Sequence, residues 1–102
     1  MYTLVNADKG EDCINLVFFD DTNDGHIKDY LVKYNDNIKI QFDKSRYVAY
    51  YDKDNNLSIT NSDNIIGHYS GSDELYRILY ISDDNNNRYI INLDIVKSIS
   101  TI

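Results

Sequence analysis

Two histidines and one cysteine are the side chains of this 102-residue chain best suited to proton transfer, nucleophilic attack or metal binding. His26, His68 and Cys13 do not show the spacing of a recognised zinc motif. Cys13 begins an apolar segment, which is typical of an inert buried thiol rather than a nucleophile. We therefore expect no metal centre and no cysteine chemistry.

The segment 67–71, Gly-His-Tyr-Ser-Gly, approximates the turn that carries the serine nucleophile of many hydrolases. That turn has the order Gly-x-Ser-x-Gly, whereas Ser70 falls one position late. The sequence also lacks a phosphate-binding glycine loop and a dinucleotide-binding motif. We predict that the protein is not an enzyme.

Aspartate-rich segments raise the question of calcium binding. An EF-hand loop needs a Gly at position 6 and a Glu at position 12. A loop that starts at Asp20 has the required glycine, but Leu31 occupies position 12 and supplies no carboxylate. A loop that starts at Asp52 has Leu57 in place of the glycine. Any Asp-rich turn produces such partial matches, so no cofactor is expected.

The charge of the chain is strongly acidic and unevenly distributed. There are 17 Asp and Glu against 10 Lys and Arg, and the formal net charge is −7. This balance argues against direct binding of nucleic-acid phosphates, which needs clustered Lys and Arg. The acids are densest in segments 20–24 and 83–84, whereas segment 26–62 holds six bases and five acids. Long-range attraction would therefore favour a basic partner.

Composition also bears on the location of the protein. A single cysteine excludes a disulfide framework. The apolar runs are far shorter than the roughly 20 residues of a membrane helix, and the N-terminus has no signal-peptide pattern. We expect a cytoplasmic protein that does not bind a membrane.

The acids and their neighbours also indicate the fold. Nearly all the acids are Asp, and Asp and Asn favour turns because their short side chains bond to nearby backbone. Between these turns lie short segments rich in Ile, Val and Tyr, which are typical of β-strands. We predict a single β-rich domain over 1–102. Its small antiparallel sheet bends into a barrel or sandwich, with at most one or two short helices.

Several segments have a defined expectation within this sheet. Segment 13–19 is apolar on both faces, so it should be a central strand that is covered on both sides. Segments 27–34 and 75–82 fit helical or strand spacing, and we favour strands. Segment 61–64 reads as a turn between two strands. The last segment, 95–102, should pair to close the sheet.

Tyrosine is unusually frequent, with ten in the chain. Its apolar ring and polar hydroxyl make it common on recognition surfaces, although it also fills cross-strand pairs in sheets. Tyr76 and Tyr80 would share one face of a strand over 75–82.

These features favour a non-enzymatic binding protein or inhibitor that occludes a basic surface of another protein. In size and acidity the chain is similar to small phage or mobile-element inhibitors of host defence, such as anti-CRISPR and DNA-mimic proteins, although no motif assigns it to one of them. Carboxylates would stand in for phosphates and Tyr would anchor the contact. The predicted partner-binding residues are Asp20, Asp21, Asp24, Asp83, Asp84, Tyr76 and Tyr80.

Two alternatives remain open at this point. One is a small-ligand or nucleotide-binding β module with a Tyr-lined pocket, in which the basic middle segment would attract an anion. The other is an oligomeric structural protein. The chain has no proline to protect its sheet edges, so unpaired edges could join between copies.

Overall fold

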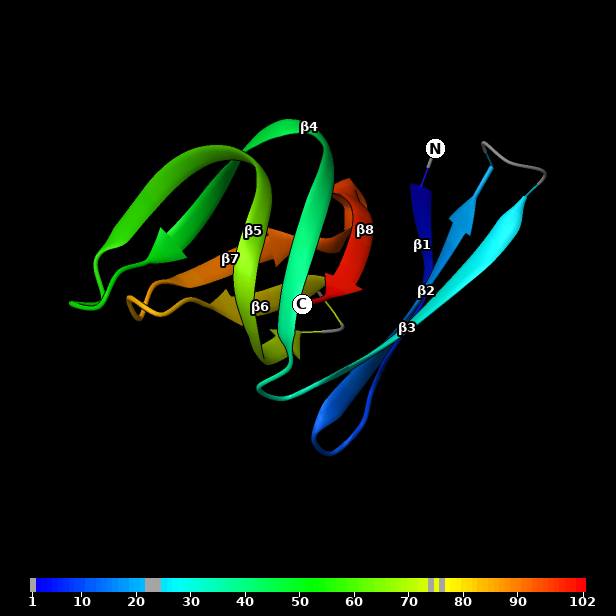
Figure 1. Ribbon diagram of the computed structural model, residues 1–102, viewed down its shortest axis with the longest axis horizontal. Helices are drawn as coiled ribbons and strands as arrows, with labels where there is room; N and C mark the ends of the chain where they lie inside the picture. The colour runs from blue at the N-terminus through cyan, green and yellow to red at the C-terminus, as the bar shows by residue number, and fades with distance from the viewer. Residues whose placement is uncertain (1, 22–24, 74, 76) are drawn as a thin grey trace.

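A computed structural model describes residues 2–21, 25–73, 75 and 77–102. These residues form two antiparallel sheets, one of three strands and one of five (Figure 1). The predicted mainly-β fold is therefore confirmed. A 3-10 turn, η1, is the one helical element in the described part of the chain. The elements are β1 (Tyr2–Lys9), β2 (Cys13–Asp20), β3 (His26–Lys33), β4 (Asn37–Tyr51), β5 (Leu57–Asp73), β6 (Ile78–Ser82), β7 (Arg88–Asn92), η1 (Leu93–Ile95) and β8 (Val96–Thr101).

The larger sheet closes on itself. Its strand order is β5-β6-β7-β4-β8, and β4 also pairs with β5, so β5, β6, β7 and β4 form a ring. The C-terminal strand β8 pairs with the first half of β4, as the sequence predicts for the last segment. The ring itself is closed by the long β4–β5 pairing. This five-stranded sheet is therefore the predicted small barrel, and the three-stranded sheet packs against it.

Strands β4 and β5 are longer than the sequence predicts. The turn expected at 61–64 is wrong, because β5 runs without interruption from Leu57 to Asp73. Segment 61–64 is polar because this part of β5 alternates between exposed and half-buried positions. In β4 the register shifts between Gln41 and Arg46, and Arg46 donates two hydrogen bonds to Asp43 at 2.9 and 2.8 Å across the bend. Both strands thereby bend around the barrel.

Segments 27–34 and 75–82 both contain a strand, as we favoured, although the second strand is shorter than predicted. β3 covers His26–Lys33, and β6 begins only at Ile78. Arg77, just before β6, has a left-handed backbone with φ of 56°. This conformation is uncommon for a side chain other than Gly, Asn or Asp, so it interrupts the extended backbone there. No helical element among the described residues could span a lipid bilayer.

The two sheets share one hydrophobic core. Ile14, Leu16 and Phe18 alternate along β2 and are fully buried against the barrel. Their barrel neighbours are equally buried, and they include Tyr69, whose hydroxyl lies 3.0 Å from the hydroxyl of Ser72. The core residues of the five-stranded sheet and η1 are Ile38, Ile40, Phe42, Val48, Ile65, Tyr69, Leu79, Ile81, Ile91, Leu93, Val96 and Ile99.

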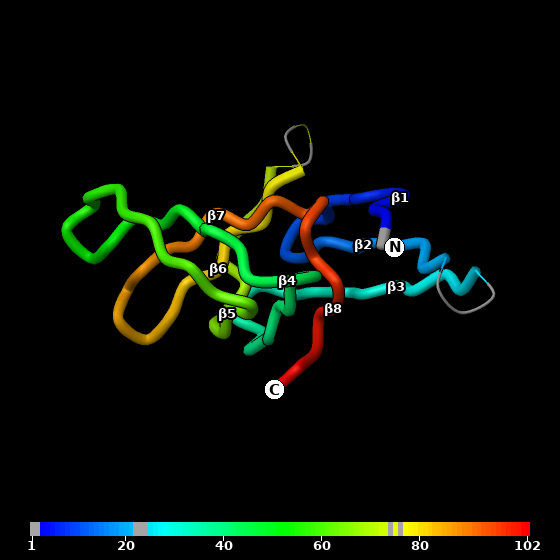
Figure 2. Tube along the Cα trace, turned by 90° about the horizontal axis from the view of Figure 1, so that it is seen from above, coloured from blue at the N-terminus to red at the C-terminus, as the bar shows by residue number. Residues whose placement is uncertain are grey.

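The outer face of the three-stranded sheet departs from the prediction. β2 is the central strand, as expected, but only its inner face is covered. On the outer face Phe19 is 37% exposed, and Val5, Ile27 and Leu31 are each more than half exposed. The expectation that β2 is covered on both sides is therefore wrong, because all the remaining described strands belong to the barrel on the inner side (Figure 2).

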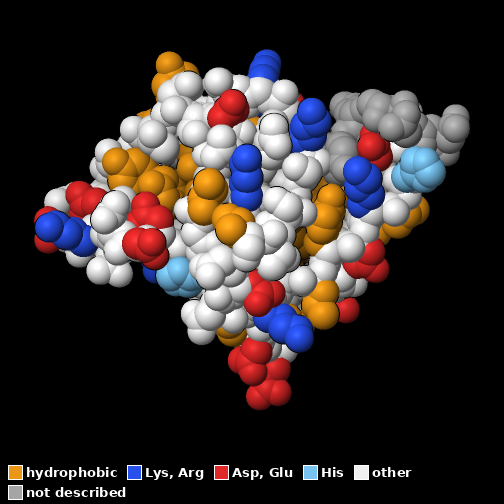
Figure 3. Space-filling view, in the orientation of Figure 1, with side chains coloured by type: hydrophobic (Ala, Val, Ile, Leu, Met, Phe, Trp, Pro, Cys, Tyr) orange, Lys and Arg blue, Asp and Glu red, His pale blue; other side chains and the backbone are white. Residues whose placement is uncertain are grey.

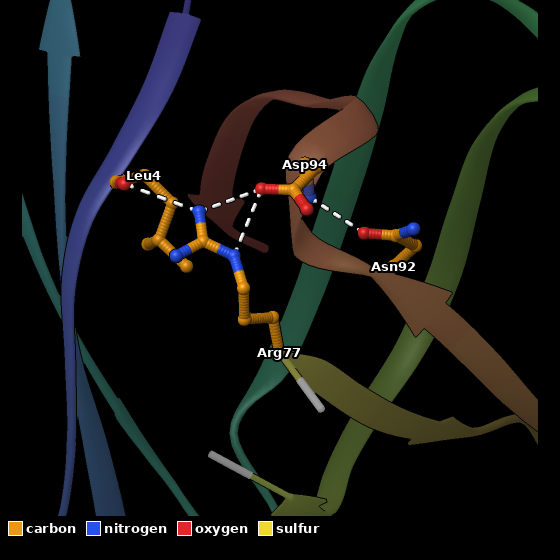
Figure 4. A network of polar contacts seen from close by, with 4 residues as sticks. All are labelled: Leu4, Arg77, Asn92 and Asp94. Carbon is orange, nitrogen blue, oxygen red and sulfur yellow. Dashed lines mark hydrogen bonds and ion pairs between the residues drawn. The ribbon is translucent and has the colours of Figure 1, made fainter. Parts of the chain in front are cut away.

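Polar contacts fix the smaller sheet to the barrel (Figure 4). The Arg77 guanidinium donates to the backbone carbonyl of Leu4 in β1 at 3.1 Å. It also donates twice to Asp94 of η1, at 2.9 and 2.6 Å. The Asp94 backbone N–H in turn donates to the Asn92 side chain at 2.9 Å. One side chain thus joins β1 and η1, which are adjacent to the buried core.

Candidate binding surface

The β4–β5 and β6–β7 turns have the same internal structure. Each starts with an Asp, Asp52 or Asp83, whose Oδ1 accepts the backbone N–H groups two and four positions later at 2.9–3.0 Å. Each also has an Asn in the left-handed region at its fourth position, Asn55 with φ of 64° and Asn86 with φ of 62°. These are the turn preferences of Asp and Asn. The first acid of each turn therefore has a structural role.

Asp83 makes further contacts within its turn. Its Oδ2 accepts the side-chain amide of Asn87 and the hydroxyl of Tyr89, both at 3.1 Å. Burial acts to raise the pKa of Asp83, but the hydrogen bonds from Asn87, Tyr89 and Asn85 together bring that pKa below its usual value. Burial and the neighbouring Asp83 carboxylate raise the pKa of Tyr89. Asp83 thus holds the turn against β7 as an ionised group.

This network makes a pH-dependent contribution to stability. We expect Asp83→Asn to lower the free energy of unfolding by about 1–2 kcal/mol at neutral pH. A carboxylate with a lowered folded-state pKa stabilises the fold above the unfolded pKa of about 3.9, and the stabilisation is lost as the pH falls through the folded-state pKa. Denaturant unfolding from neutral pH to pH 3 should therefore show the difference shrinking below about pH 4.

Asp84→Asn is the matched control for this prediction, because the Asp84 side chain is exposed. It should leave the stability at neutral pH within about 0.5 kcal/mol of the wild type. A destabilisation by Asp83→Asn that stays constant across the pH range would contradict the role assigned to the Asp83 carboxylate.

The two turns lie side by side at one end of the molecule (Figure 1). An open hollow of about 450 Å³ lies between them, lined by Asp52, Lys53, Asp54 and residues 85–87. With Asp83 and Asp84, this end carries four carboxylates and one lysine. We call this group, Asp52, Asp54, Asp83 and Asp84, the acidic rim.

The described residues of the two predicted acidic clusters do not come together. The end of β2 lies at the opposite end of the molecule from the β6–β7 turn in both views (Figures 1 and 2). Asp20 is only 6% exposed and faces the inner side of its sheet, so it does not form part of an exposed acidic surface. Asp21 is exposed. Asp24 and Tyr76 lie outside the described residues. The acids near Asp83 are instead those of the β4–β5 turn.

Next to the acidic rim, the outer surface of the barrel carries a row of large side chains. Tyr51 lies opposite Leu57 on one side and Arg88 on the other. One step along the strands, Ala49 lies opposite Ile59 and Ile90, and Ile90 lies opposite Tyr80. Opposite residues in antiparallel strands project from the same face of a sheet. This face therefore continues across β5, β4, β7 and β6.

This face is apolar and much of it is open to solvent. Tyr47 is 79% exposed, Leu57 63% and Ile59 66%. Figure 3 shows hydrophobic side chains beside acidic ones toward the end that carries the two turns. We define the aromatic face as Tyr47, Tyr51, Leu57, Ile59, Tyr80 and Arg88.

Arg88 organises the centre of the aromatic face. Its guanidinium carbon lies 5.3 Å from the centre of the Tyr51 ring and 5.6 Å from that of Tyr80. Both distances are within the range of cation–π attraction. Arg88 thus contacts two tyrosines of different strands, while its own side chain remains exposed.

The sequence identified part of this surface. The fold brings three of the predicted partner-binding residues to this surface: Tyr80, Asp83 and Asp84. The β4–β5 hairpin across 52–56 joins neighbouring segments, and its register alone places Tyr47, Tyr51, Leu57 and Ile59 on one face. Arg88 was missed, because its position beside Tyr51 depends on the β4–β7 pairing between distant segments.

The described residues hold no group of three or more His, Cys, Asp and Glu side chains that could bind a metal ion. His68 lies at the border of a hollow of about 310 Å³ with Tyr51, Ser82 and Arg88.

Comparison of the chain with protein-family models, with curated proteins and with solved structures finds no match in any of the three.

Proposed function

We propose that the protein is a non-enzymatic binding protein that occludes a basic surface of another protein. The aromatic face makes the central contact and the acidic rim borders it. The observation that carries the proposal is the exposure of Tyr47, Leu57 and Ile59 on one continuous face beside four carboxylates. Stable interfaces combine an apolar centre, rich in Tyr and Arg, with a polar border.

The charge of the acidic rim favours a partner surface rich in Lys and Arg. Four carboxylates against Lys53 and the neighbouring Arg88 leave this end with a net negative charge, which accelerates encounter with a positive surface and is weakened by salt. Surfaces that bind nucleic acid are basic, so they form the class of target that this arrangement fits best. This mode of action is the one that the similarity to anti-CRISPR and DNA-mimic inhibitors implies.

A second candidate is a site for a small anionic ligand. The hollow beside the aromatic face has Arg88 and His68 in its lining, together with the acidic Asp52, and a volume of about 310 Å³. That volume is at the lower end for small-molecule sites. A nucleotide bound there should raise the melting temperature, whereas a protein-binding surface should show no such response.

The first experiment is affinity capture from a lysate of the source cells, followed by measurement of the dissociation constant with the purified partner. A double variant, Leu57→Lys with Ile59→Lys, should weaken binding at least about thirtyfold, because it places positive charge at the centre of a contact with a basic surface. Asp84→Lys should weaken binding and reduce its dependence on salt.

Leu75→Lys provides the matched control, since Leu75 is highly exposed but lies outside the aromatic face. It should bind the partner as the wild type does. If the double variant binds within threefold of the wild type, or if Leu75→Lys is as damaging, the aromatic face is not the binding surface.

A further inference from the structure

Strand β3 is an edge of the three-stranded sheet. It pairs with β2 along its full length, from His26 to Lys33, and its other side has no strand partner within the described residues. Such an edge presents a row of backbone donors and acceptors that another strand can pair with. Proteins commonly block an edge of this kind with proline, which this chain lacks.

The side chains on β3 also suit contact with a second copy. Ile27 and Leu31 project from the outer face and are more than half exposed. Two copies of a chain with net charge −7 repel each other at most surfaces. β3 is an exception, because it holds Lys28 and Lys33 against a single acid, Asp29. β3 itself therefore carries a small net positive charge, which reduces the repulsion between copies at this edge.

We propose that two copies of the protein pair through β3 in an antiparallel dimer centred on Leu31. A twofold axis perpendicular to the sheet keeps the outer faces of both copies on the same side. This axis lies midway between the two β3 strands, so the residue at the centre of the pairing lies opposite its own copy. With Leu31 on the axis, Asp29 lies opposite the partner's Lys33. By symmetry, Lys33 lies opposite the partner's Asp29, which gives two complementary cross-strand pairs.

Other centres are less favourable. An axis through Asp29 places two carboxylates opposite each other, and one through Lys28 does the same for two ammonium groups. An axis through Tyr30 places Asp29 opposite the partner's Leu31. Of these four registers, only the Leu31-centred one matches opposite charges on the outer face. This charge complementarity selects a second copy as the occupant of the edge.

The dimer would join the molecules at the end away from the acidic rim (Figure 1). Each copy would keep its aromatic face free, so the assembly would present two binding surfaces. This inference does not rest on the proposed function, because β3 contributes no residue to the aromatic face or to the acidic rim.

A charge-swap experiment tests the dimer and its register together. The molar mass in solution, measured by light scattering, should be twice that of the 11.9 kDa chain for the wild type. Asp29→Lys and Lys33→Asp each place like charges opposite each other in both pairs, so each should weaken the dimer at least about tenfold. An equimolar mixture of these two variants should recover the dimer, because every facing pair is then complementary.

Asp8→Lys is the matched control, with the same charge change on the opposite edge strand of the same sheet. It should remain dimeric. A monomeric wild type would overturn the proposal. A dimer that Asp29→Lys leaves intact, or a mixture that does not recover the dimer, would overturn it equally.

A disulfide measures the register directly. Opposite residues of antiparallel strands have Cα atoms about 4.5–5.5 Å apart, within the range that a disulfide spans. Leu31→Cys in a Cys13→Ser background should therefore form a covalent dimer rapidly on mild oxidation, whereas Asp8→Cys in the same background should remain mostly monomeric. Equal cross-linking of the two variants would contradict pairing at Leu31.

Discussion

Replacing Phe18 with alanine should lower the free energy of unfolding by about 3–5 kcal/mol. The Phe18 ring is fully buried between the two sheets. It meets the Tyr30 ring edge-on, with the centres of the two rings 5.9 Å apart. Its removal leaves a cavity in the shared core, so the lost burial and the cavity both reduce stability. Denaturant unfolding measures the change, which is large compared with the 5–15 kcal/mol stability of most single domains.

The adjacent residue supplies the control. Phe19 has the same side chain on the same strand, but it lies on the outer face and is 37% exposed. Phe19→Ala should therefore cost clearly less, about 1 kcal/mol. Equal losses at the two positions would mean that the outer face is as well covered as the core, contrary to the structure.

Gly67→Ala should destabilise the barrel by about 2–3 kcal/mol. A Cβ atom at Gly67 would lie 2.5 Å from the backbone oxygen of Ser82 and 2.7 Å from Cγ2 of Ile81. The Ser82 oxygen belongs to the paired strand β6, so the methyl group can be accommodated only if β5 and β6 move apart. Thermal or denaturant unfolding measures this cost.

Gly10→Ala separates this close contact from the general effect of replacing glycine. Its Cβ would lie 2.9 Å from Sγ of Cys13, which is the end of a side chain and can rotate away. We expect a change of less than about 1 kcal/mol at Gly10. If Gly67→Ala is as stable as Gly10→Ala, β5 and β6 are not packed as closely as the structure shows.

Much of the fold follows from local sequence. Short segments rich in Ile, Val and Tyr identify the strands, and the Asn and Asp runs at 52–56 and 83–87 coincide with two hairpin turns. Each of these features depends on neighbours in the chain, such as an Asp side chain that accepts N–H groups of its own turn. Local chemistry is therefore sufficient to place them.

Features that depend on distant segments were not predictable in this way. Segment 61–64 is as polar as a turn, yet it continues β5 because β4 pairs with β5 on both sides of the register shift between Gln41 and Arg46. The outer face of β2 is apolar, which normally indicates coverage on both sides, but no described element of the chain covers it. The position of Arg88 beside two tyrosines also requires pairing across the ring.

The acids of the candidate site also depend on contacts between distant segments. The sequence grouped the acids by density, as the segments 20–24 and 83–84. The fold places the end of β2, with Asp20, at the opposite end from 83–84 and places the acids at 52–54 beside 83–84 instead. Asp20 is directed inward because β2 continues to that residue and the inward positions of β2 are the even-numbered ones. Spatial neighbours, rather than neighbours in the chain, form the acidic rim.

The most direct test of the binding surface is hydrogen–deuterium exchange of the protein, alone and in complex with the captured partner. Binding through the aromatic face should slow exchange in segments 47–61 and 78–90, which contain the aromatic face and both turns. Exchange in β2 and β3 should remain unchanged. Slower exchange confined to the three-stranded sheet, with segments 47–61 and 78–90 unaffected, would contradict the proposed function.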